Sequence, residues 1–349
     1  MRKLLNTLYV TTPEAYLSKD GTNVVVSDQG KTLFRIPIQN IESICTFGYQ
    51  GASPGLMRLC AESGVNLSFF SPQGRFIARI QGPVSGNILL RHTQYKLFEN
   101  VDFATHLASI IVSGKIYNSR ITLRRFVRDY PERAGVEDAE IISEKLKRYY
   151  RLARRAIPMN ELRGIEGYAA NAYFDVFPKL IFNNHPHFKF TKRTRRPPTD
   201  PINAMLSFGY SLLAADCTSA LEGVGLDPSL GVLHAMRPGR HSLALDLMEE
   251  FRSYIVDRFV ISLINTRKIT ASDFLIHTDS DLETSLSVML TDNGRKKFLS
   301  AWQNKKKTEI IHPFLSEKVP IGLLPHCQAL LLSRYLRGDI DDYPVFLSK

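Results

Sequence analysis

Cysteine is scarce in this sequence, and its placement excludes whole classes of site. The chain has four cysteines, and none of them forms a CxxC pair: Cys45, Cys60, Cys217 and Cys327. Zinc and iron–sulfur centres use clustered thiolates, and disulfide scaffolds use many closely spaced cysteines. The pattern therefore predicts reduced, buried thiols in a cytoplasmic protein.

Long apolar runs are also missing. No run reaches the roughly 18 residues that a membrane-spanning helix needs. The first residues, MRKLLNTLYVTTPEAY, lack the continuous apolar core and the small-residue cleavage site of a signal peptide. No internal repeat or low-complexity tail occurs either. We therefore expect a globular protein that has no membrane partner.

What the chain does have is length and positive charge. With 349 residues, of which 44% are apolar and 23% charged, it is long enough for two domains that each bury a core. Its 45 basic and 34 acidic residues give a net charge of +11. Such an excess suits a nucleic-acid partner, but many basic proteins bind none, so charge alone decides little.

The pattern of the chain changes near residue 90. Before it, short β-rich runs such as TNVVVSD and KTLFRIPI follow Asp-Gly or Gly turns, and one stretch, 54–63, looks helical. After residues 81–86, a Gly- and Pro-containing linker, long amphipathic segments follow. The sequence predicts an α+β multidomain protein. A small β-rich N-terminal domain (1–86) would be followed by a larger all-α C-terminal domain (87–349).

One basic stretch stands out from the rest. Residues 189–198 read KFTKRTRRPP, and Phe188 precedes them. Cations with interleaved aromatics suit contacts to phosphates, with Phe188 and Phe190 stacking on bases. The alternative is a solvated surface loop without a ligand.

Glu166 lies in a segment, roughly 161–177, whose apolar residues recur at helical spacing. Gly164 and Gly167 flank it. Each interior glycine costs a helix about 1 kcal/mol relative to alanine. Two glycines beside one carboxylate suggest that another backbone or a ligand comes close there. The alternative is a surface glutamate on a helix that packs tightly through its glycines.

A histidine and an acidic pair form the second candidate cluster. His234 ends an apolar stretch, and His241 is the competing imidazole beyond a basic turn. A helix should begin near Ser242, a good N-cap residue, with Asp246 and Glu249 close enough to share one ion. Carboxylates with one imidazole suit Mg²⁺ or Mn²⁺. Judged singly, each of these residues is better explained as a structural or solvated side chain than as a ligand.

Three segments together resemble a known family. LRGIEGYAANAYF, RRPPTDPINAMLSFGYSLL and GVLHAMRPGRHSLALDLMEEFR are similar to the hallmark blocks of the CRISPR-associated adaptation endonuclease/integrase, the universal spacer-acquisition enzyme. LNTLYV and the second block are similar to the type I-C branch. The resemblance implies that Glu166, His234 and Glu249 are the catalytic metal ligands. Much of the family has aspartate at the last position, so Asp246 is a candidate to share or replace Glu249.

The resemblance also implies a reaction and partners. A 3′-hydroxyl of a short captured duplex would attack a phosphodiester of the CRISPR repeat, with Mg²⁺ or Mn²⁺ stabilising the phosphate charge. The expected assembly pairs homodimers, joined through the β-rich domain, with a small ferredoxin-like CRISPR adaptation protein. The expected phosphate contacts are the arginines of two basic segments: Arg193, Arg195, Arg196, Arg237 and Arg240.

Two other hypotheses remain open from the residues alone. The chain could be a non-catalytic DNA-binding scaffold whose carboxylates are structural. It could also be a metal-dependent nuclease acting on RNA, or a hydrolase of a small phosphorylated substrate. Removal of metal separates the first from the main hypothesis, and a substrate panel separates the second.

Overall fold

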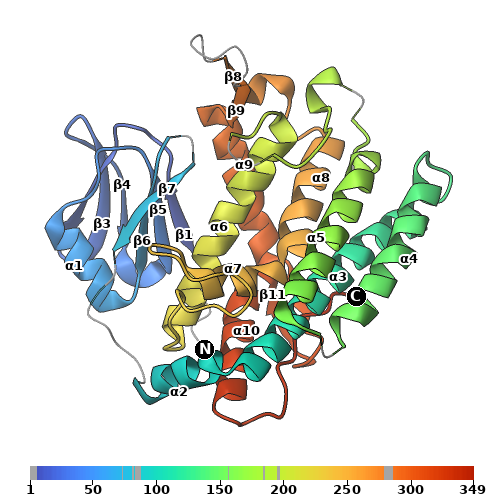
Figure 1. The fold of residues 1–349 in the computed structure, drawn as a ribbon. Coiled ribbons are helices and arrows are strands. Elements are labelled where there is room, and N and C mark those ends of the chain that lie inside the picture. The colour runs from blue at the N-terminus through green and yellow to red at the C-terminus, as the bar shows by residue number, and fades with distance from the viewer. Residues whose placement is uncertain are drawn as a thin grey trace.

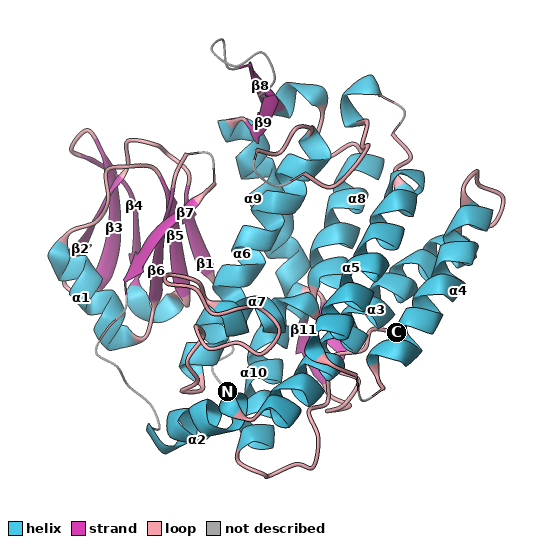
Figure 2. Ribbon diagram, viewed as in Figure 1, coloured by secondary structure: helices cyan, strands magenta, loops and turns pink. Residues whose placement is uncertain are grey.

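The computed structural model describes residues 6–72, 74–80, 82, 88–155, 157–183, 185–194, 197–278 and 286–349. A strand-rich N-terminal part stands beside a larger helical part (Figures 1 and 2). This arrangement agrees with the α+β class that the sequence predicts. The division into two domains at residue 86 stays a prediction.

The N-terminal part holds two sheets. In the first, β5 pairs in parallel with both β1 and β6, and β7 closes the edge in antiparallel fashion: β1 (Thr7–Val10), β5 (Ser43–Phe47), β6 (Asn66–Phe70) and β7 (Phe76–Ile80). The second sheet is an antiparallel meander: β2 (Tyr16–Asp20), β3 (Asn23–Asp28) and β4 (Lys31–Pro37). Gly21 and Gly30 sit in its two turns with positive φ, which glycine adopts at little cost.

One helix, α1 (Pro54–Ser63), lies against these strands, with the predicted bounds. Ser53 caps its first turn by accepting a hydrogen bond from the Leu56 amide, and Gly64 ends it in the left-handed conformation. Leu56 and Cys60 are fully buried on its inner face. The apolar spacing thus places this helix over the core between the sheets.

Helices dominate the rest of the chain, and α3 runs through its centre (Figure 1). None of the described helices has the length and apolar character needed to cross a membrane. The helices are α2 (Ile88–Glu99), α3 (Val101–Asp129), α4 (Val136–Ala153), α5 (Met159–Val176), α6 (Pro201–Gly223), α7 (Ser242–Glu249), α8 (Arg258–Asn265), α9 (Asp292–Lys307) and α10 (Leu324–Leu336).

The prediction of an all-α C-terminal part is wrong in one respect. Two antiparallel strand pairs occur there: β8 (Phe274–Thr278) with β9 (Leu286–Leu290), and β10 (Glu309–Ile311) with β11 (Lys318–Pro320). Each strand has only three to five residues. Segments that short leave little periodicity to detect between long helical windows.

The strand-rich and helical parts share buried surface. Phe47 and Phe70 belong to the core of the helical part, and Phe208 on α6 packs edge-on against Phe47. A Cβ added at Gly74, which precedes β7, would lie 2.6 Å from the Phe208 ring, so glycine is needed for this close approach. The two parts therefore pack through a continuous apolar contact.

The C-terminal tail is buried rather than loose. Tyr343 and Phe346 are 3% and 1% exposed. Asn118 on α3 donates to the Phe346 carbonyl at 2.8 Å and accepts from the Ser348 amide at 2.7 Å. A Cβ on Gly114, also on α3, would lie 2.3 Å from Val345. The tail is thus fixed against the middle of α3.

Candidate functional site

The helix predicted from Ser242 onward is interrupted. It begins at Ser242, but the Ser242 hydroxyl donates to the Ala235 carbonyl instead of capping the helix. After α7, a π-helical turn, η4 (Arg252–Asp257), precedes α8. Such turns are frequent at functional sites because they redirect side chains. Here the break follows Glu249, and Arg252 turns back to contact that carboxylate at 2.7 Å.

Asp246 holds the loop that carries His234. The Asp246 carboxylate is fully buried and accepts from the amides of residues 232, 233 and 234 at 2.7, 3.1 and 3.0 Å. It also contacts His234 Nδ1 at 2.6 Å. A Cβ on Gly231 would lie 2.6 Å from the Asp246 Oδ2, so only glycine admits this close approach. These four contacts occupy the lone pairs that a metal ion would need, which speaks against the predicted role of Asp246 as a ligand.

Glu249 is a buried carboxylate surrounded by cations. It is 2% exposed, and its Oε2 lies 2.7 Å from Lys115 Nζ. His234 Nε2 lies 3.9 Å from its other oxygen. Burial alone would raise the pKa of Glu249, but the charges of Arg252 and Lys115 outweigh it and hold that pKa well below its usual value. Glu249 is therefore ionised at neutral pH.

Glu166 joins the cluster through the same lysine. It lies on α5, is partly exposed, and its Oε1 forms an ion pair with Lys115 Nζ. Among the residues that the structure describes, Cβ atoms added on Gly164 and Gly167 would meet no atom within 4 Å outside their own helix backbone. Two of the explanations for these glycines, a close protein backbone and tight packing of the helix through them, are therefore wrong. The surface beside Glu166 is open, which leaves room for a ligand.

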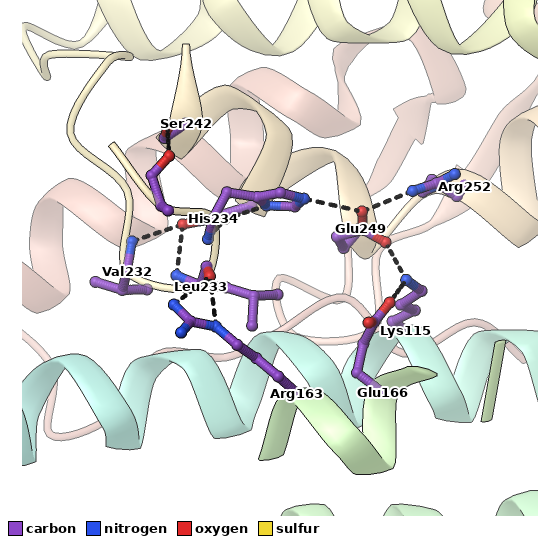
Figure 3. A network of polar contacts seen from close by, with 11 residues as sticks. Lys115, Arg163, Glu166, Val232, Leu233, His234, Ser242, Glu249 and Arg252 are labelled. Carbon is purple, nitrogen blue, oxygen red and sulfur yellow. Dashed lines mark hydrogen bonds and ion pairs between the residues drawn. The ribbon is translucent and has the colours of Figure 1, made fainter. Parts of the chain in front are cut away.

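Figure 3 shows the whole arrangement. Lys115 from α3 lies between Glu166 and Glu249, and the His234 ring points toward Glu249 from the other side. No three His, Cys, Asp or Glu side chains in the described ranges are already gathered closely enough to hold an ion. The two predicted carboxylates thus meet at a lysine ammonium, and the imidazole lies beside the other oxygen of Glu249.

Three members of this site were not predicted from the sequence: Lys115, Arg252 and Gly231. Lys115 lies in an apolar stretch of the sequence, ASIIVSGKIYN, where a lysine predicted to be buried needs an anionic partner. Arg252 is three residues from Glu249, a spacing that gives a helical ion pair. The sequence contains both signals, but neither says which carboxylate lies opposite. His241, the competing imidazole, contacts the Ser229 hydroxyl at 3.3 Å instead.

The basic stretch differs from the expectation. Phe188 and Phe190 are each 5% exposed and pack in the helical core, so the prediction that they stack on bases is wrong. Arg193 donates to Asn203 Oδ1 at 2.7 Å and to Ser207 Oγ at 3.1 Å, which ties it to α6. Arg195 and Arg196 lie outside the described residues.

The other two predicted phosphate contacts, Arg237 and Arg240, flank a tight turn after His234. Arg237 is exposed and Arg240 is half-buried. The Arg240 amide donates to the Arg237 carbonyl at 3.0 Å, and Gly239 has a positive φ. The turn therefore presents cationic surface close in sequence to the imidazole.

A protein-family comparison decides the family. The sequence model of the protein family described as CRISPR associated protein Cas1 matches residues 8–304 of this chain. This chain belongs to the Cas1 family. It is 48% identical over 347 residues to a CRISPR-associated endonuclease Cas1 of Chlorobaculum tepidum, with 99% of each chain covered. It is 46% identical over 353 residues to a Cas1 endonuclease of Rhodospirillum rubrum, with 100% of each covered. The predicted family, a CRISPR-associated nuclease and integrase, is thus confirmed.

Solved structures agree on the fold. A Cas1 protein from Thermotoga maritima matches with a TM-score of 0.80 at 25% identity, covering 99% of this chain and 100% of that one. A casposase bound to an integration product matches with a TM-score of 0.80 at 24% identity, covering 98% and 94%. At that identity the casposase shows that the Cas1 fold is shared. The type I-C branch stays a prediction.

Proposed function

We propose that this Cas1 protein is a metal-dependent DNA endonuclease and integrase. It would insert short foreign DNA fragments into a CRISPR array as new spacers, through attack of a 3′-hydroxyl on a phosphodiester. One observation carries the proposal. Glu166 and Glu249, from helices far apart in the sequence, meet at one cation with His234 beside them.

The donor set fits Mg²⁺ or Mn²⁺. Two carboxylates and one imidazole are hard ligands, and the ammonium of Lys115 shows that a cation is accommodated between the carboxylates. Glu166, His234 and Glu249 would hold the ion. When bound, such an ion polarises the scissile phosphate and lowers the pKa of an attacking hydroxyl.

The chain prepares these ligands for binding. Asp246 accepts the Nδ1 proton of His234 and so leaves Nε2 as the coordinating nitrogen. Arg252 keeps Glu249 ionised and fixes its Oε1. We therefore assign Asp246 to positioning His234, and Glu249 rather than Asp246 to the ion.

The DNA contacts and the assembly are proposed on surface features. Arg237 and Arg240 flank the turn after His234 and suit phosphate contacts to a captured duplex and a CRISPR repeat. Residues 1–86 would form the homodimer contact, since β4 exposes Leu33 and Phe34 at 53% and 46%. Residues 87–349 would carry the catalytic, metal-binding and DNA-binding functions.

The proposed assembly includes the small ferredoxin-like adaptation protein. One solved match is a Cas6-RT-Cas1–Cas2 complex, with a TM-score of 0.83 at 22% identity, in which this chain covers 36% of the matched chain. That complex joins the matched protein to Cas2. For this chain the partner is part of the proposal, to be supplied in the assay.

An integration assay tests the function. It combines a short duplex carrying free 3′-hydroxyls, a supercoiled plasmid with a CRISPR repeat, the small partner, and Mn²⁺ or EDTA. We expect joining with Mn²⁺, none with EDTA, and none for His234→Ala or Glu166→Ala variants that fold normally. Binding without joining under every condition would favour a DNA-binding scaffold. Cleavage confined to RNA would favour the ribonuclease hypothesis.

A further inference from the structure

Lys115 stands where the proposed function needs a metal ion. Its Nζ contacts Glu166 Oε1 and lies 2.7 Å from Glu249 Oε2, and its side chain is 14% exposed. Two carboxylates this close repel each other unless a cation lies between them. Arg252 neutralises Glu249 from the opposite oxygen, but Glu166 has its ion pair with Lys115. The lysine thus neutralises the pair in the metal-free protein.

A small cavity adjoins this lysine. It measures about 30 Å³, and the polar side chains in its walls include those of Lys115, Tyr210, Arg252, Ser253 and Asp257. A water molecule needs roughly 10–15 Å³ of such space, and an ammonium group is of similar size. The cavity therefore has room for the head of a displaced lysine.

The cavity walls offer oxygen acceptors to a cation. Asp257 is 2% exposed and accepts a hydrogen bond from the Tyr210 hydroxyl. The Ser253 hydroxyl is buried, and within the described part of the chain it has no hydrogen-bond partner. The cation already in the wall, Arg252, is paired with Glu249 at 2.7 Å. The Asp257 carboxylate and the unused Ser253 hydroxyl would then compensate the desolvation of an ammonium group.

We propose that Lys115 is a built-in substitute for the divalent ion, and that ion binding moves its ammonium group into the cavity beside Asp257. This inference rests on the proposed metal-dependent function. A divalent ion carries twice the charge of Lys115 and binds carboxylate oxygens at about 2.1 Å, so it outcompetes the ammonium group between Glu166 and Glu249. The exchange keeps the two carboxylates neutralised in both states.

Metal binding to the full chain without DNA provides the first test. Free Mn²⁺ is measured by electron paramagnetic resonance for wild type, Lys115→Met and Lys297→Met. Lys297 is the matched control because its Nζ bridges both oxygens of buried Asp273 at 2.8 and 2.9 Å, away from this site. Without its internal competitor, Lys115→Met should bind Mn²⁺ about tenfold more tightly, whereas the control should match wild type. Equal or weaker binding by Lys115→Met would overturn the inference.

Thermal unfolding gives a second readout. In EDTA, Lys115→Met should melt below wild type because its carboxylates repel, and saturating Mn²⁺ should raise its melting temperature by more than it raises that of wild type. If Lys115→Met fails to fold, Lys115→Arg replaces it. A guanidinium keeps the charge but exceeds the cavity, so this variant should bind Mn²⁺ more weakly than wild type. Tighter binding by Lys115→Arg would contradict the exchange.

A double-mutant cycle tests the destination of the lysine. Asp257→Asn should weaken Mn²⁺ binding when Lys115 is present, because the displaced ammonium group loses its counter-charge. It should have no effect in the Lys115→Met background. Equal effects in both backgrounds would show that Lys115 does not move to Asp257.

His234→Ala separates this inference from the proposed function. If neither wild type nor Lys115→Met binds Mn²⁺ in a way that His234→Ala abolishes, the metal assignment fails and the exchange fails with it. If binding depends on His234 but Lys115→Met is no tighter than wild type, only the exchange is wrong.

Discussion

Glu249 and Glu250 are neighbours in sequence, both are buried, and their surroundings have opposite effects. Glu249 lies beside Lys115 of α3 and Arg252 of η4, whose charges hold its pKa well below the usual value despite burial. Glu250 faces the C-terminal tail. Burial raises its pKa to about 7, although hydrogen bonds from Tyr343, the Phe346 amide and Gln328 lower it in part.

The difference indicates that the two neighbouring carboxylates at the end of α7 have different roles. Cations keep a carboxylate charged, as a metal ligand must be. Neutral donors form hydrogen bonds to the Glu250 oxygens without supplying a positive charge, so the buried carboxyl group holds its own proton more readily. The Glu249 side is therefore prepared for an ion, and the Glu250 side attaches the C-terminal tail to the core.

The largest expected effect comes from removing one charge at a time. Glu249→Gln should lower the rate of DNA joining by about two to three orders of magnitude, because the proposed ion loses a charged ligand. Glu250→Gln mimics the protonated form of Glu250, so its rate of DNA joining should stay within a few fold of wild type at pH 7. Joining assays on the two variants measure this directly. Similar losses in both would end the distinction between the two sides.

Stability against pH should show the next largest effect. The folded pKa of Glu250, about 7, lies above its ordinary value of 4.5, so its stabilising contribution is complete below about pH 4.5 and is lost as pH rises through 7. Glu250→Gln removes that loss. Its free energy of unfolding relative to wild type should rise by up to about 3 kcal/mol between pH 5 and pH 8. Denaturant titrations at both pH values test this, and a constant difference would contradict it.

Asp246→Asn sharpens the comparison because it alters the residue that holds His234, the imidazole beside Glu249. An amide cannot accept all four hydrogen bonds, so the loop and the His234 tautomer are less well fixed. Loss of such a positioning partner should weaken Mn²⁺ binding by about 10- to 100-fold. Titrations with Mn²⁺ measure the change. Complete loss of binding, as for His234→Ala, would instead indicate that Asp246 is itself a ligand.

The smallest effect concerns the two arginines of the turn after His234. Arg252 is engaged by Glu249, whereas Arg237 is exposed on the turn with Arg240. Replacing Arg237 and Arg240 by alanine should lower the slope of log affinity against log salt by about 0.9 for each lost phosphate contact. Binding titrations with duplex DNA at several salt concentrations test this. An unchanged slope would remove the turn from the DNA interface.

Parts of the fold were predictable because local patterns specify them. The bounds of α1, the start of α7, the helix around Glu166 and the buried state of all four cysteines agree with the sequence. The short strands of the C-terminal part and the π-helical turn after Glu249 were missed. Each short strand pairs with the next strand in the sequence and has too few residues to show a clear period, and π turns are rare interruptions within helical stretches.

Within the site, the sequence supplied the residue types, and the three-segment resemblance supplied Glu166, His234 and Glu249. It could not separate Asp246 from Glu249, since both are acidic and three residues apart on one helix. The structure gives them different surroundings: the 231–234 loop surrounds Asp246 with amides, while α3 presents Lys115 to Glu249.

The sequence by itself determined the two-part layout, the family and the identity of the candidate ligands, because periodicity, turn residues and motif blocks are local properties of the chain. Only the tertiary structure decided which buried carboxylate stays ionised and which cations lie beside it. Lys115, Glu166 and Glu249 lie on α3, α5 and α7, and their ionisation depends on distances that form when those helices pack. Electrostatic interaction and desolvation act through space, so sequence separation carries no information about them.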